Sequence, residues 1–573
     1  SLLAQVLRVS DAAAAKLDIR PVLYANKVLA GIMSSPLATG RGVKRTYVHM
    51  PGRQFANCPV RKVLKRWGWE EKDWWTLPMS EWMGNTYFAS ADLFWSLDAT
   101  LTNWYAFPNV KLTNHVDGAC YLCNKLSLGW CLDGCAECAA LFFPRQHNVV
   151  LSHTFRTFAE DYSAMQNIAN CQVLWGNNGA GRRLPPTCKA NLWSFLNNGN
   201  SGCESDSAPQ MEEWSGATPQ AAGTESETRQ QKLTGPANAW VVKGIDGGWW
   251  GNNGLAVSIL TAWPEILAEC ERYKWECVVQ KYLEKPLLVS GLDGGPSLHK
   301  TDMRLWALVV DRNPLVLFVH PVVYFRIAQT PYQFSANGST PDPYAHKTNW
   351  RDKDNRATLG EVLRRGGPNA EQIWEKRTWP MLLDVTRAAV LASADLSFGP
   401  SVNGRPRKNK PPAFEIFGLD CALDDEWRPW LLEVNRSPAM LDDCKIPELM
   451  QFADEAIESM LSISLAYTEG TLTLPTAEEL QAFEAPEAAD AERLFPKELL
   501  NGHSARRWCY GKEVLSVPPC LVRGLSLGEP CGGWLLALCT AKRDERELER
   551  WAQDAWRRWM ADTNAGWGRT AVW

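Results

Sequence analysis

The stretch FEIFGLDCALDDEWRPWLLEVN, from Phe414 to Asn435, predicts a β-hairpin, because two apolar segments flank the charged, turn-forming run Asp424–Pro429. Side chains on a strand alternate between its two faces, so Glu433 and Asn435 point the same way. With the turn centred in the charged run, Asp420 lies directly across from Glu433 on that face. The hairpin is therefore expected to bring two carboxylates and an amide together within an apolar sheet.

These three side chains predict a metal site. Burying carboxylates is costly unless a cation or an equivalent partner compensates them. A small number of hard oxygen ligands suits Mg²⁺, which is usually completed by substrate phosphates and water. We therefore expect Asp420, Glu433 and Asn435 to carry Mg²⁺ beside a nucleotide.

The bulk composition is that of a globular protein with several lobes. The chain has 573 residues, of which 45% are hydrophobic and 22% charged. Lys plus Arg number 60 against 64 Asp plus Glu, and the net charge of −4 gives no general signal for nucleic acid or membrane binding. Apolar runs are shorter than the roughly 18 residues of a membrane span, and the first residues lack a signal-peptide core. We therefore expect neither nucleic acid nor a membrane as a partner.

The 17 cysteines predict reduced, mostly buried thiols in the cytoplasm, because the chain is large and shows no secretory signal. One cluster is denser and comprises Cys120, Cys123, Cys131, Cys135 and Cys138. Zinc binding is one interpretation, but paired CxxC knuckles are normally separated by a longer loop. Packing thiols are the favoured interpretation.

Changes in composition divide the chain into five segments. Residues 197–236 are rich in Asn, Gly, Ser, Thr, Gln and Glu, which predicts a disordered insertion or linker. Near the end, AKRDERELERWAQDAWRRWM predicts a solvated or docking helix. The expected segments are an N-terminal extension (1–44), N-terminal and central lobes (45–196), the linker (197–236), a catalytic region (237–467) and a C-terminal helical extension (468–573).

Two motifs in the catalytic region predict nucleotide contacts. AWVVKGIDGGWWGNNGLAV ends a strand at Lys243 and continues into a glycine-rich loop, where backbone N–H groups can approach phosphate oxygens. Glycine-rich turns after strands are common, so this motif alone has low specificity. WECVVQKYLEKPLLV, from Trp275, predicts a core strand, and its backbone at Gln280–Leu283 is placed to meet an adenine edge in a nucleotide enzyme.

Charged residues follow on the next predicted strands. HKTDMRLWALVV carries Lys300, Asp302 and Arg304, and the last two share a face because they lie two apart. A surface ion pair on an edge strand is the alternative. After the turn DRNPL, one long strand, LVLFVHPVVYFRIA, ends near Arg326, which suits bidentate binding of a carboxylate or phosphate. The loop residues Thr348–Asn349 have a satisfied turn as their default interpretation.

In this order the motifs resemble the tubulin tyrosine ligase-like family of ATP-dependent amino-acid ligases. The matching pieces, in register over about 200 residues, are VVK at Val241, VVQKYLEKPLL at Val278, K-x-D-x-R at Lys300, the Arg326 strand, Thr348–Asn349, and D…E-x-N at Asp420, Glu433 and Asn435. Upstream, RKVLKRWGWEE, KLTNHVDGACYLCNKL and FFPRQHNVVLSHTFRTFAEDY are similar to that family's N-terminal lobes. The resemblance runs from about Arg45 to Tyr467. It implies an α/β ATP-grasp fold with an N-terminal α/β lobe, a central lobe and a C-terminal antiparallel-sheet lobe.

The resemblance also implies roles for the candidate residues. ATP would be held by Lys243, Gly251, Asn252, Asn253, Gly254, Leu255, Gln280, Lys281, Tyr282, Leu283, Lys300, Asp302, Thr348 and Asn349. Lys300, Arg304 and Arg326 would be catalytic, and Asp420, Glu433 and Asn435 would hold Mg²⁺. A substrate carboxylate would be activated as an acyl-phosphate, which the amine of a free amino acid then attacks. Positioning and electrostatic stabilisation would supply most of the rate.

Three short segments, FFPR, DRNPL and PWLLEVNRSPAM, are similar to the glycine-adding branch of the family. The resemblance therefore favours addition of glycine to glutamate side chains of tubulin C-terminal tails, at the cytoskeleton of a cilium or flagellum axoneme. The glutamate-adding and tyrosine-adding branches share the ATP machinery and stay open. Four basic loop residues are candidates for binding the acidic tail, against a merely solvated loop: Arg405, Arg407, Lys408 and Lys410.

One departure from the family affects the phosphate loop. Where the family has a proline and a basic glycine loop, this chain has Gly244 and WWGNNG, so the expected basic side chain is absent. A missing charge-assisted contact costs about 1.5–3 kcal/mol. We still expect an active enzyme, because the metal residues and the charged strand residues remain. A microtubule-binding pseudoenzyme is the competing class, and a ligase acting on a small molecule or another acidic protein fits the same site.

Overall fold

The computed structural model describes about half of the chain. The described residues are 45–50, 58–72, 91–96, 110–116, 118–133, 139–149, 157–163, 165–166, 234–235, 237–245, 257–334, 342–349, 354–397, 401–402, 405–406, 411–441, 443–472, 534–539 and 544–563. The predicted N-terminal extension and nearly all of the predicted linker lie outside these ranges. Within them, no helix has both the length and the apolar character needed to cross a membrane.

The N-terminal lobe is a small parallel sheet with one helix against it. Its strands lie in the order β2 (Glu70–Glu71), β1 (Thr46–Met50), β3 (Leu93–Ser96) and β4 (Leu112–Thr113). The helix α5 (Pro59–Arg66) buries Val60, Val63 and Leu64, as its amphipathic pattern requires. Backbone hydrogen bonds between Thr113 and the 412–414 segment attach this lobe to the main sheet.

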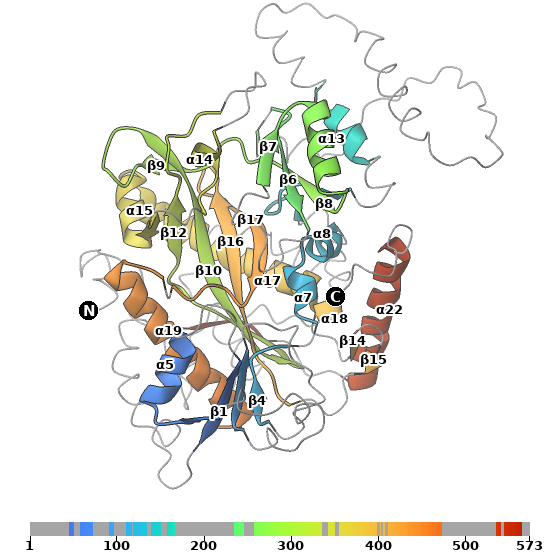
Figure 1. Cartoon of the computed structure of the whole chain (residues 1–573), viewed down its shortest axis with the longest axis vertical. Helices are drawn as coiled ribbons and strands as arrows, with labels where there is room; N and C mark the ends of the chain where they lie inside the picture. The colour runs from blue at the N-terminus through green and yellow to red at the C-terminus, as the bar shows by residue number, and fades with distance from the viewer. Residues whose placement is uncertain are drawn as a thin grey trace, which may run out of the picture.

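The central lobe is a four-stranded antiparallel sheet, at the top in Figure 1. Its strands lie in the order β5 (Gln146–Asn148), β8 (Cys277–Lys281), β6 (Trp240–Gly244) and β7 (Val257–Leu260), with α13 (Trp263–Arg272) packed against them. The helices α7 (Cys120–Cys123) and α8 (Lys125–Asp133) approach the same sheet at β5.

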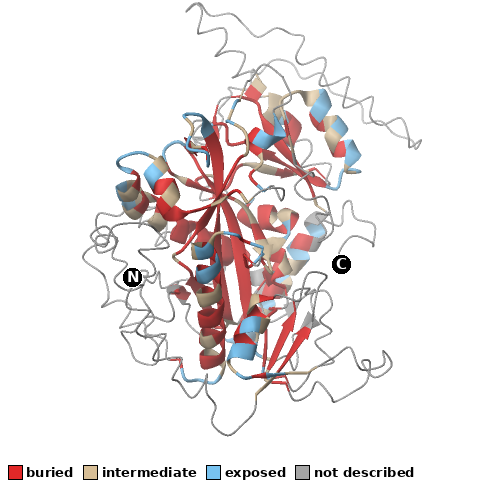
Figure 2. Ribbon diagram, turned by 60° about the vertical axis from the view of Figure 1, so that its left-hand side comes forward, coloured by how far each residue is buried: buried red, intermediate tan, exposed pale blue. Residues whose placement is uncertain are grey.

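The main sheet is antiparallel and is organised by one long strand, β10 (Leu298–Arg312). Figure 2 shows β10 and its neighbours buried along most of their length. Its other described strands are β9 (Leu288–Ser290), β11 (Leu315–Val319), β12 (Tyr324–Ile327), β13 (Arg356–Thr358), β16 (Glu415–Leu423), β17 (Pro429–Arg436) and β18 (Leu535–Cys539).

The other described helices lie around and beside this sheet. They are α14 (Pro343–His346), α15 (Leu359–Arg365), α16 (Ala370–Ile373), a π-helical turn (Trp374–Thr378), α17 (Trp379–Ala392), α18 (Ala394–Ser397), α19 (Pro447–Thr468) and α22 (Glu545–Thr563). A two-stranded ribbon of β14 (Ser401–Val402) and β15 (Arg405–Pro406) completes the described elements. The lobes together give the expected α/β architecture with an antiparallel C-terminal sheet.

The predicted hairpin is confirmed in its register. β16 pairs with β17 antiparallel, and Asp420 is the partner of Glu433. One prediction about the strands was wrong: the single strand expected from Leu315 to Ala328 is divided into β11 and β12. Pro321 interrupts it because proline has no backbone N–H to donate to a ladder, and the N–H of Val322 bonds to His320 Nδ1 at 3.2 Å instead.

The C-terminal extension was expected to be helical, but its described residues form a strand as well as a helix. α22 overlaps the helix predicted for residues 541–560 and extends to Thr563, but Leu535–Cys539 forms β18 and pairs with β11 at the edge of the main sheet. Local sequence pattern gave no sign of this pairing, because the partner strand lies more than 200 residues earlier.

Candidate functional site

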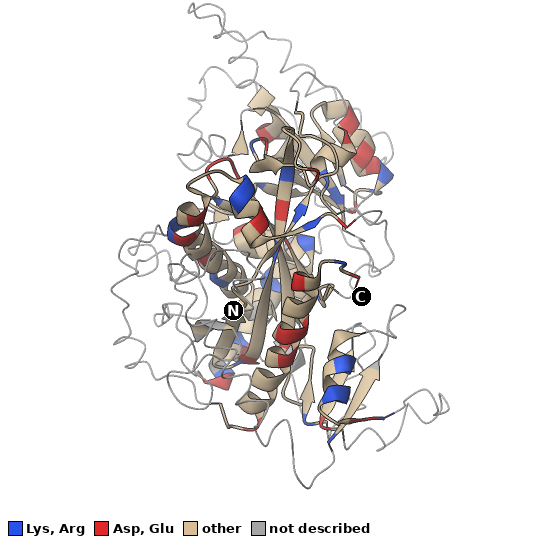
Figure 3. Cartoon of the chain, turned by 90° about the vertical axis from the view of Figure 1, so that its left-hand side faces the viewer, with Lys and Arg blue, Asp and Glu red and all other residues tan. Residues whose placement is uncertain are grey.

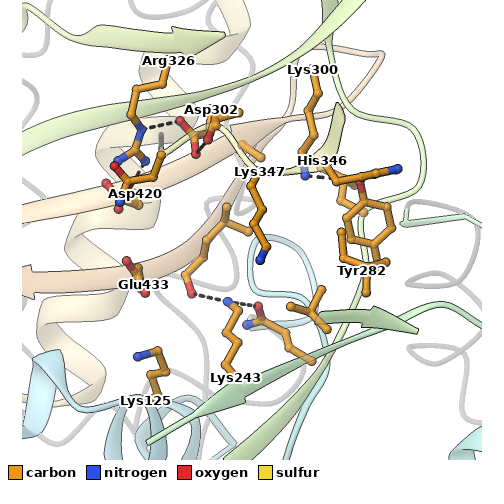
Figure 4. Close-up of a pocket in the computed structure, with 18 of the residues that line it drawn as sticks. Lys125, Lys243, Tyr282, Lys300, Asp302, Arg326, His346, Lys347, Asp420 and Glu433 are labelled. Carbon is orange, nitrogen blue, oxygen red and sulfur yellow. Dashed lines mark hydrogen bonds and ion pairs between the residues drawn. The ribbon is translucent and has the colours of Figure 1, made fainter. Parts of the chain in front are cut away.

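A cavity of about 330 Å³ lies between the central lobe and the main sheet. Its polar lining consists of Lys125, Lys243, Gln280, Lys281, Tyr282, Lys300, Asp302, Arg326, His346, Lys347, Thr348, Asn349, Asp420, Glu433 and Asn435. Apolar contacts come from Val241, Ile259, Leu283, Ala422 and Leu432. Most of the residues predicted from separate motifs therefore lie around one space (Figure 4).

One side of the cavity is built from paired charges. Arg304 on β10 forms a two-pronged ion pair with Asp420 on β16, and its Nη2 lies 3.0 Å from Asp420 Oδ2. Arg326 on β12 donates to Asp302 at 2.6 Å and reaches Asp420 Oδ2 at 3.3 Å. Burial opposes ionisation of Asp420, but the two guanidinium groups outweigh it and lower the pKa of this carboxyl.

These pairs correct the alternative of a surface ion pair between Asp302 and Arg304. The two residues do share a strand, but both are buried on a central strand and each pairs with a partner on a neighbouring strand. Arg304 is also absent from the cavity lining and lies behind Asp420. The structure therefore places Arg304 as a support for Asp420.

The predicted metal residues lie together at the same end of the hairpin. Asn435 Nδ2 lies 3.2 Å from Asp420 Oδ2 and 3.4 Å from Glu433 Oε1. The donors fit a hard divalent cation in type, being two carboxylates and one amide oxygen beside a cavity. Among the described residues, however, no group of three or more His, Cys, Asp or Glu side chains could hold a metal ion. A cation here would need the amide oxygen and substrate oxygens as further ligands.

The described part of the cysteine cluster likewise forms no group of three or more side chains that could hold a metal ion. Cys120, Cys123 and Cys131 form no disulfide, and the first two are half-buried while Cys131 is buried. Burial raises the pKa of the Cys123 thiol, which disfavours the thiolate that zinc requires. Cys135 and Cys138 lie outside the described residues.

Two further lysines around the cavity are buried with neutral partners, Lys243 on β6 and Lys300 on β10. Lys243 Nζ donates to Gln280 Oε1 at 2.7 Å and to the Leu432 carbonyl at 3.3 Å. Burial lowers its pKa to about 8, against the opposing effect of Glu433. Lys300 Nζ lies 3.3 Å from the Tyr282 hydroxyl, and burial lowers its pKa to about 8 as well. Both amines are poised to gain from a bound anion, which would favour their charged form.

A hydrogen-bond chain fixes Lys300. The Tyr282 hydroxyl lies 2.6 Å from His346 Nδ1, and His346 Nε2 lies 3.1 Å from the carbonyl of Gln333. A carbonyl can only accept, so Nε2 carries the proton and Nδ1 accepts from the tyrosine. Burial, with Lys300 nearby, lowers the pKa of His346 to about 4, so the ring is neutral at physiological pH. The chain leaves the tyrosine oxygen free to accept from Lys300.

The remaining predicted nucleotide residues differ in placement. Thr348 donates to Asp302, and Asn349 is exposed at the cavity edge. Lys281 turns its amine to Glu284 and to the Tyr282 carbonyl, so its side chain is already paired. The predicted loop residues Gly251, Asn252, Asn253, Gly254 and Leu255 lie outside the described residues.

Sequence reasoning missed two lysines of the cavity, Lys125 and Lys347. Lys125 is the first residue of α8, where the side chain of Asn124 accepts from the N–H of Leu126 at 2.9 Å. This helix cap is the only local signal, and it marks a helix start. Lys347 directly precedes the predicted pair Thr348–Asn349, and this proximity was the available signal.

The three lobes and the cavity between the central and C-terminal sheets define a protein of the ATP-grasp fold. The model of the tubulin-tyrosine ligase family matches residues 187–471. These residues include the central-lobe strands β6–β8, β10, β12 and the hairpin that lines the cavity. Over this region, which is just under half of the chain, the sequence is therefore that of the tubulin-tyrosine ligase family.

Individual relatives are similar at low identity. Tubulin glycylase 3D of Tetrahymena thermophila is 23% identical over 280 residues, covering 46% of this chain and 24% of the relative. Tubulin polyglutamylase ttll-5 of Caenorhabditis elegans is 30% identical over 190 residues, covering 30% and 25%. The human tubulin monoglycylase TTLL3 is 29% identical over 185 residues, covering 29% and 21%. The chain spans about a quarter or less of the length of these relatives.

Proposed function

We propose that this chain is an ATP-dependent ligase that adds an amino acid, with glycine favoured, to glutamate side chains of tubulin C-terminal tails. The single observation that carries the proposal is the cavity, where Lys243, Lys300 and Arg326 face Asp420 and Glu433. Cationic and carboxylate groups gathered in one space suit a magnesium nucleotide. Names of the similar relatives, which act on tubulin with glycine or glutamate, support the substrate class.

In this proposal the reaction has two steps. The terminal phosphoryl group of ATP passes to an oxygen of the substrate carboxylate, and ADP leaves with the electron pair of the broken P–O bond. The amine of the free amino acid then attacks the carbonyl carbon, phosphate leaves with the C–O electron pair, and the nitrogen loses a proton. The bound Mg²⁺ would neutralise phosphate charge.

The chain's residues would divide this work. Lys243 and Lys300 would bind phosphate oxygens as compact charges. Arg326 would orient a carboxylate, and Glu433 with Asp420 and Asn435 would hold Mg²⁺. The Tyr282–His346 chain would fix Lys300 in place, which lowers the entropy lost in reaching the transition state.

The proposed partner is tubulin or microtubules, with a cytoskeletal site such as a ciliary or flagellar axoneme. An acidic tail would be bound by Arg405, Arg407, Lys408 and Lys410. Arg405 lies in β15, and the other three lie outside the described residues. Replacing all four with Ser should weaken tail binding at low salt and have little effect at high salt, because salt screens the attraction between opposite charges. Equal binding at low salt, measured by anisotropy of a labelled tail peptide, would remove this loop from the proposal.

The decisive experiment is label incorporation into tubulin with Mg-ATP, run in parallel with glycine, glutamate and tyrosine. Glu433→Gln removes one proposed metal ligand and should abolish incorporation. Glu426→Gln, an exposed carboxylate in the turn of the same hairpin, is the matched control and should leave it intact. Incorporation of glycine alone supports the favoured branch, and incorporation of glutamate or tyrosine alone reassigns it. A small-molecule acceptor would be indicated by ATP turnover without any label in tubulin.

One observation favours a second candidate, a tubulin-binding protein without turnover. The carboxylate oxygens of Asp420 already contact Arg304, Arg326 and Asn435. These oxygens are therefore less available to a metal. Thermal unfolding with Mg-ATP separates the two proposals. A ligand at 100 times its Kd stabilises the folded state by about 2.7 kcal/mol, and a protein that has lost the site should show no such gain.

A further inference from the structure

The C-terminal helix α22 lies outside the family match, yet it packs beside the helices that border the cavity. In Figure 1 it runs along α18 and faces α7 and α8. Its contacts fall into two groups, one at each end of the helix. Together they connect the main sheet to the helix that supplies Lys125.

The first group ties the segment to the main sheet. Glu545, at the start of α22, accepts from Asn313 Nδ2 at 2.8 Å and from Arg312 at 3.2 and 3.3 Å, at the tip between β10 and β11. Directly before the strand β18, Trp534 is fully buried and donates to the Ala456 carbonyl at 3.1 Å. Arg387 on α17 donates to the Ala537 carbonyl of β18 at 2.6 Å. The last two contacts are buried and make β18 part of the folded core.

The second group is aromatic and lies at the other end of α22. The Trp559 ring packs edge-on against Trp130 of α8 with centroids 5.3 Å apart, and Trp559 is 9% exposed. Trp556 packs against Tyr121 of α7 at 6.0 Å. The same apolar cluster includes Leu126, next to Lys125, and Val278 on β8. The cluster therefore lies directly behind two elements that line the cavity.

The helix α8 is held from its other side by β5. Gln146 Nε2 donates to the Lys125 carbonyl at 2.8 Å, and Asn148 donates to the Leu126 carbonyl at 3.3 Å. Gly129 permits this approach, because a Cβ there would overlap the Gln146 amide. With β5 on one side and α22 on the other, both the position and the tilt of α8 are fixed. Lys125 reaches the cavity from this fixed helix start.

We propose that α22 is a positioning element of the nucleotide site, in which Trp559 and Trp556 hold α8 so that the Lys125 amine lies in the cavity. Neither tryptophan touches the cavity, so both are positioning residues. The inference rests on the proposed function only in taking the cavity ligand to be a magnesium nucleotide. It adds a part of the chain beyond residues 187–471 to the machinery of the site.

The test is a double-mutant cycle on Kd for Mg-ATP, measured by calorimetry on the full chain. Trp559→Ala should weaken binding about five- to tenfold, the range expected for loss of an aromatic pair that positions a ligand group. Lys125→Ala should weaken it at least as much. In the Lys125→Ala protein, Trp559→Ala should add less than about twofold, since residues that act through one another are not additive. Trp559→Phe should restore most of the affinity.

Controls keep the outcomes distinct. Arg558→Ala, an exposed neighbour on the same helix, should leave Kd unchanged. If Trp559→Ala does not fold, Trp556→Ala, which removes a half-buried ring one turn away, takes its place in the cycle. Additive effects of the tryptophan and lysine substitutions, or an unchanged Kd in the tryptophan variant, would overturn the inference. Absence of Mg-ATP binding by the unaltered chain would instead overturn the proposed function.

Discussion

Two groups of charged residues around the cavity treat buried charge in opposite ways. On the paired side, Arg304, Asp420, Arg326 and Asp302 neutralise one another through direct ion pairs. On the lysine side, Lys243 of β6 and Lys300, which β10 also supplies, have neutral partners, and burial lowers the pKa of each to about 8. The charged residues of β10 lie toward its two ends, and the stretch between them is uncharged (Figure 3). The comparison teaches that the charges of the paired side balance one another, whereas the lysine side can still bind an anion.

The largest expected effect comes from breaking the paired side. Arg304→Met leaves Asp420 buried with only Arg326 and Asn435 as partners, and removing one member of a buried pair costs about 3–5 kcal/mol. We expect about 3 kcal/mol, the low end, because Arg326 remains. Urea unfolding of Arg304→Met against Arg364→Met, an exposed control on α15, measures it. A loss below about 1 kcal/mol would show that Asp420 does not depend on this arginine.

Breaking the lysine side should have the opposite effect on stability. A pKa lowered from 10.5 to about 8 corresponds to about 3 kcal/mol of unfavourable burial of the charge. Lys243→Met removes that charge, so we expect the free energy of unfolding to stay level or rise. Mg-ATP binding should weaken roughly 10- to 100-fold through the lost charge-assisted bond. Lys285→Met, at an exposed lysine near the cavity, is the control, and a large loss of stability in Lys243→Met would contradict the comparison.

The smallest expected effect is a pH dependence of binding. The folded pKa values of Lys243 and Lys300 lie below those of the unfolded chain, so the stability penalty is full below pH 8 and disappears as pH rises toward 10.5. A bound phosphate favours the protonated amines, so binding should take up protons and weaken by about fivefold per group between pH 8 and 9. Calorimetry in two buffers of different ionisation enthalpy measures the uptake. A flat profile up to pH 9.5 would place neither lysine at the phosphate.

The sequence predicted the hairpin well because alternation within a strand is a local property. Asp420 and Glu433 are paired as predicted, but the register shifts by one residue between Asp420 and Cys421, and the sequence showed no sign of this irregularity. The partners of Asp302 and Arg304 could not be predicted in this way, since they depend on which strands flank β10. Lys125 had no signal beyond a helix cap, because its place in the cavity follows from the packing of α8 between distant elements.

The length of β10 has a geometric consequence. Lys300 and Arg312 lie at opposite ends of one strand, and 12 residues at about 3.3 Å each separate them by about 40 Å. If a strand of that length rotates by about 2° at one end, the other end moves by about 1.4 Å. Lengthening a hydrogen bond by that distance is enough to break it. The position of Lys300 in the cavity therefore depends partly on the far end of β10, where Arg312 and Asn313 contact Glu545.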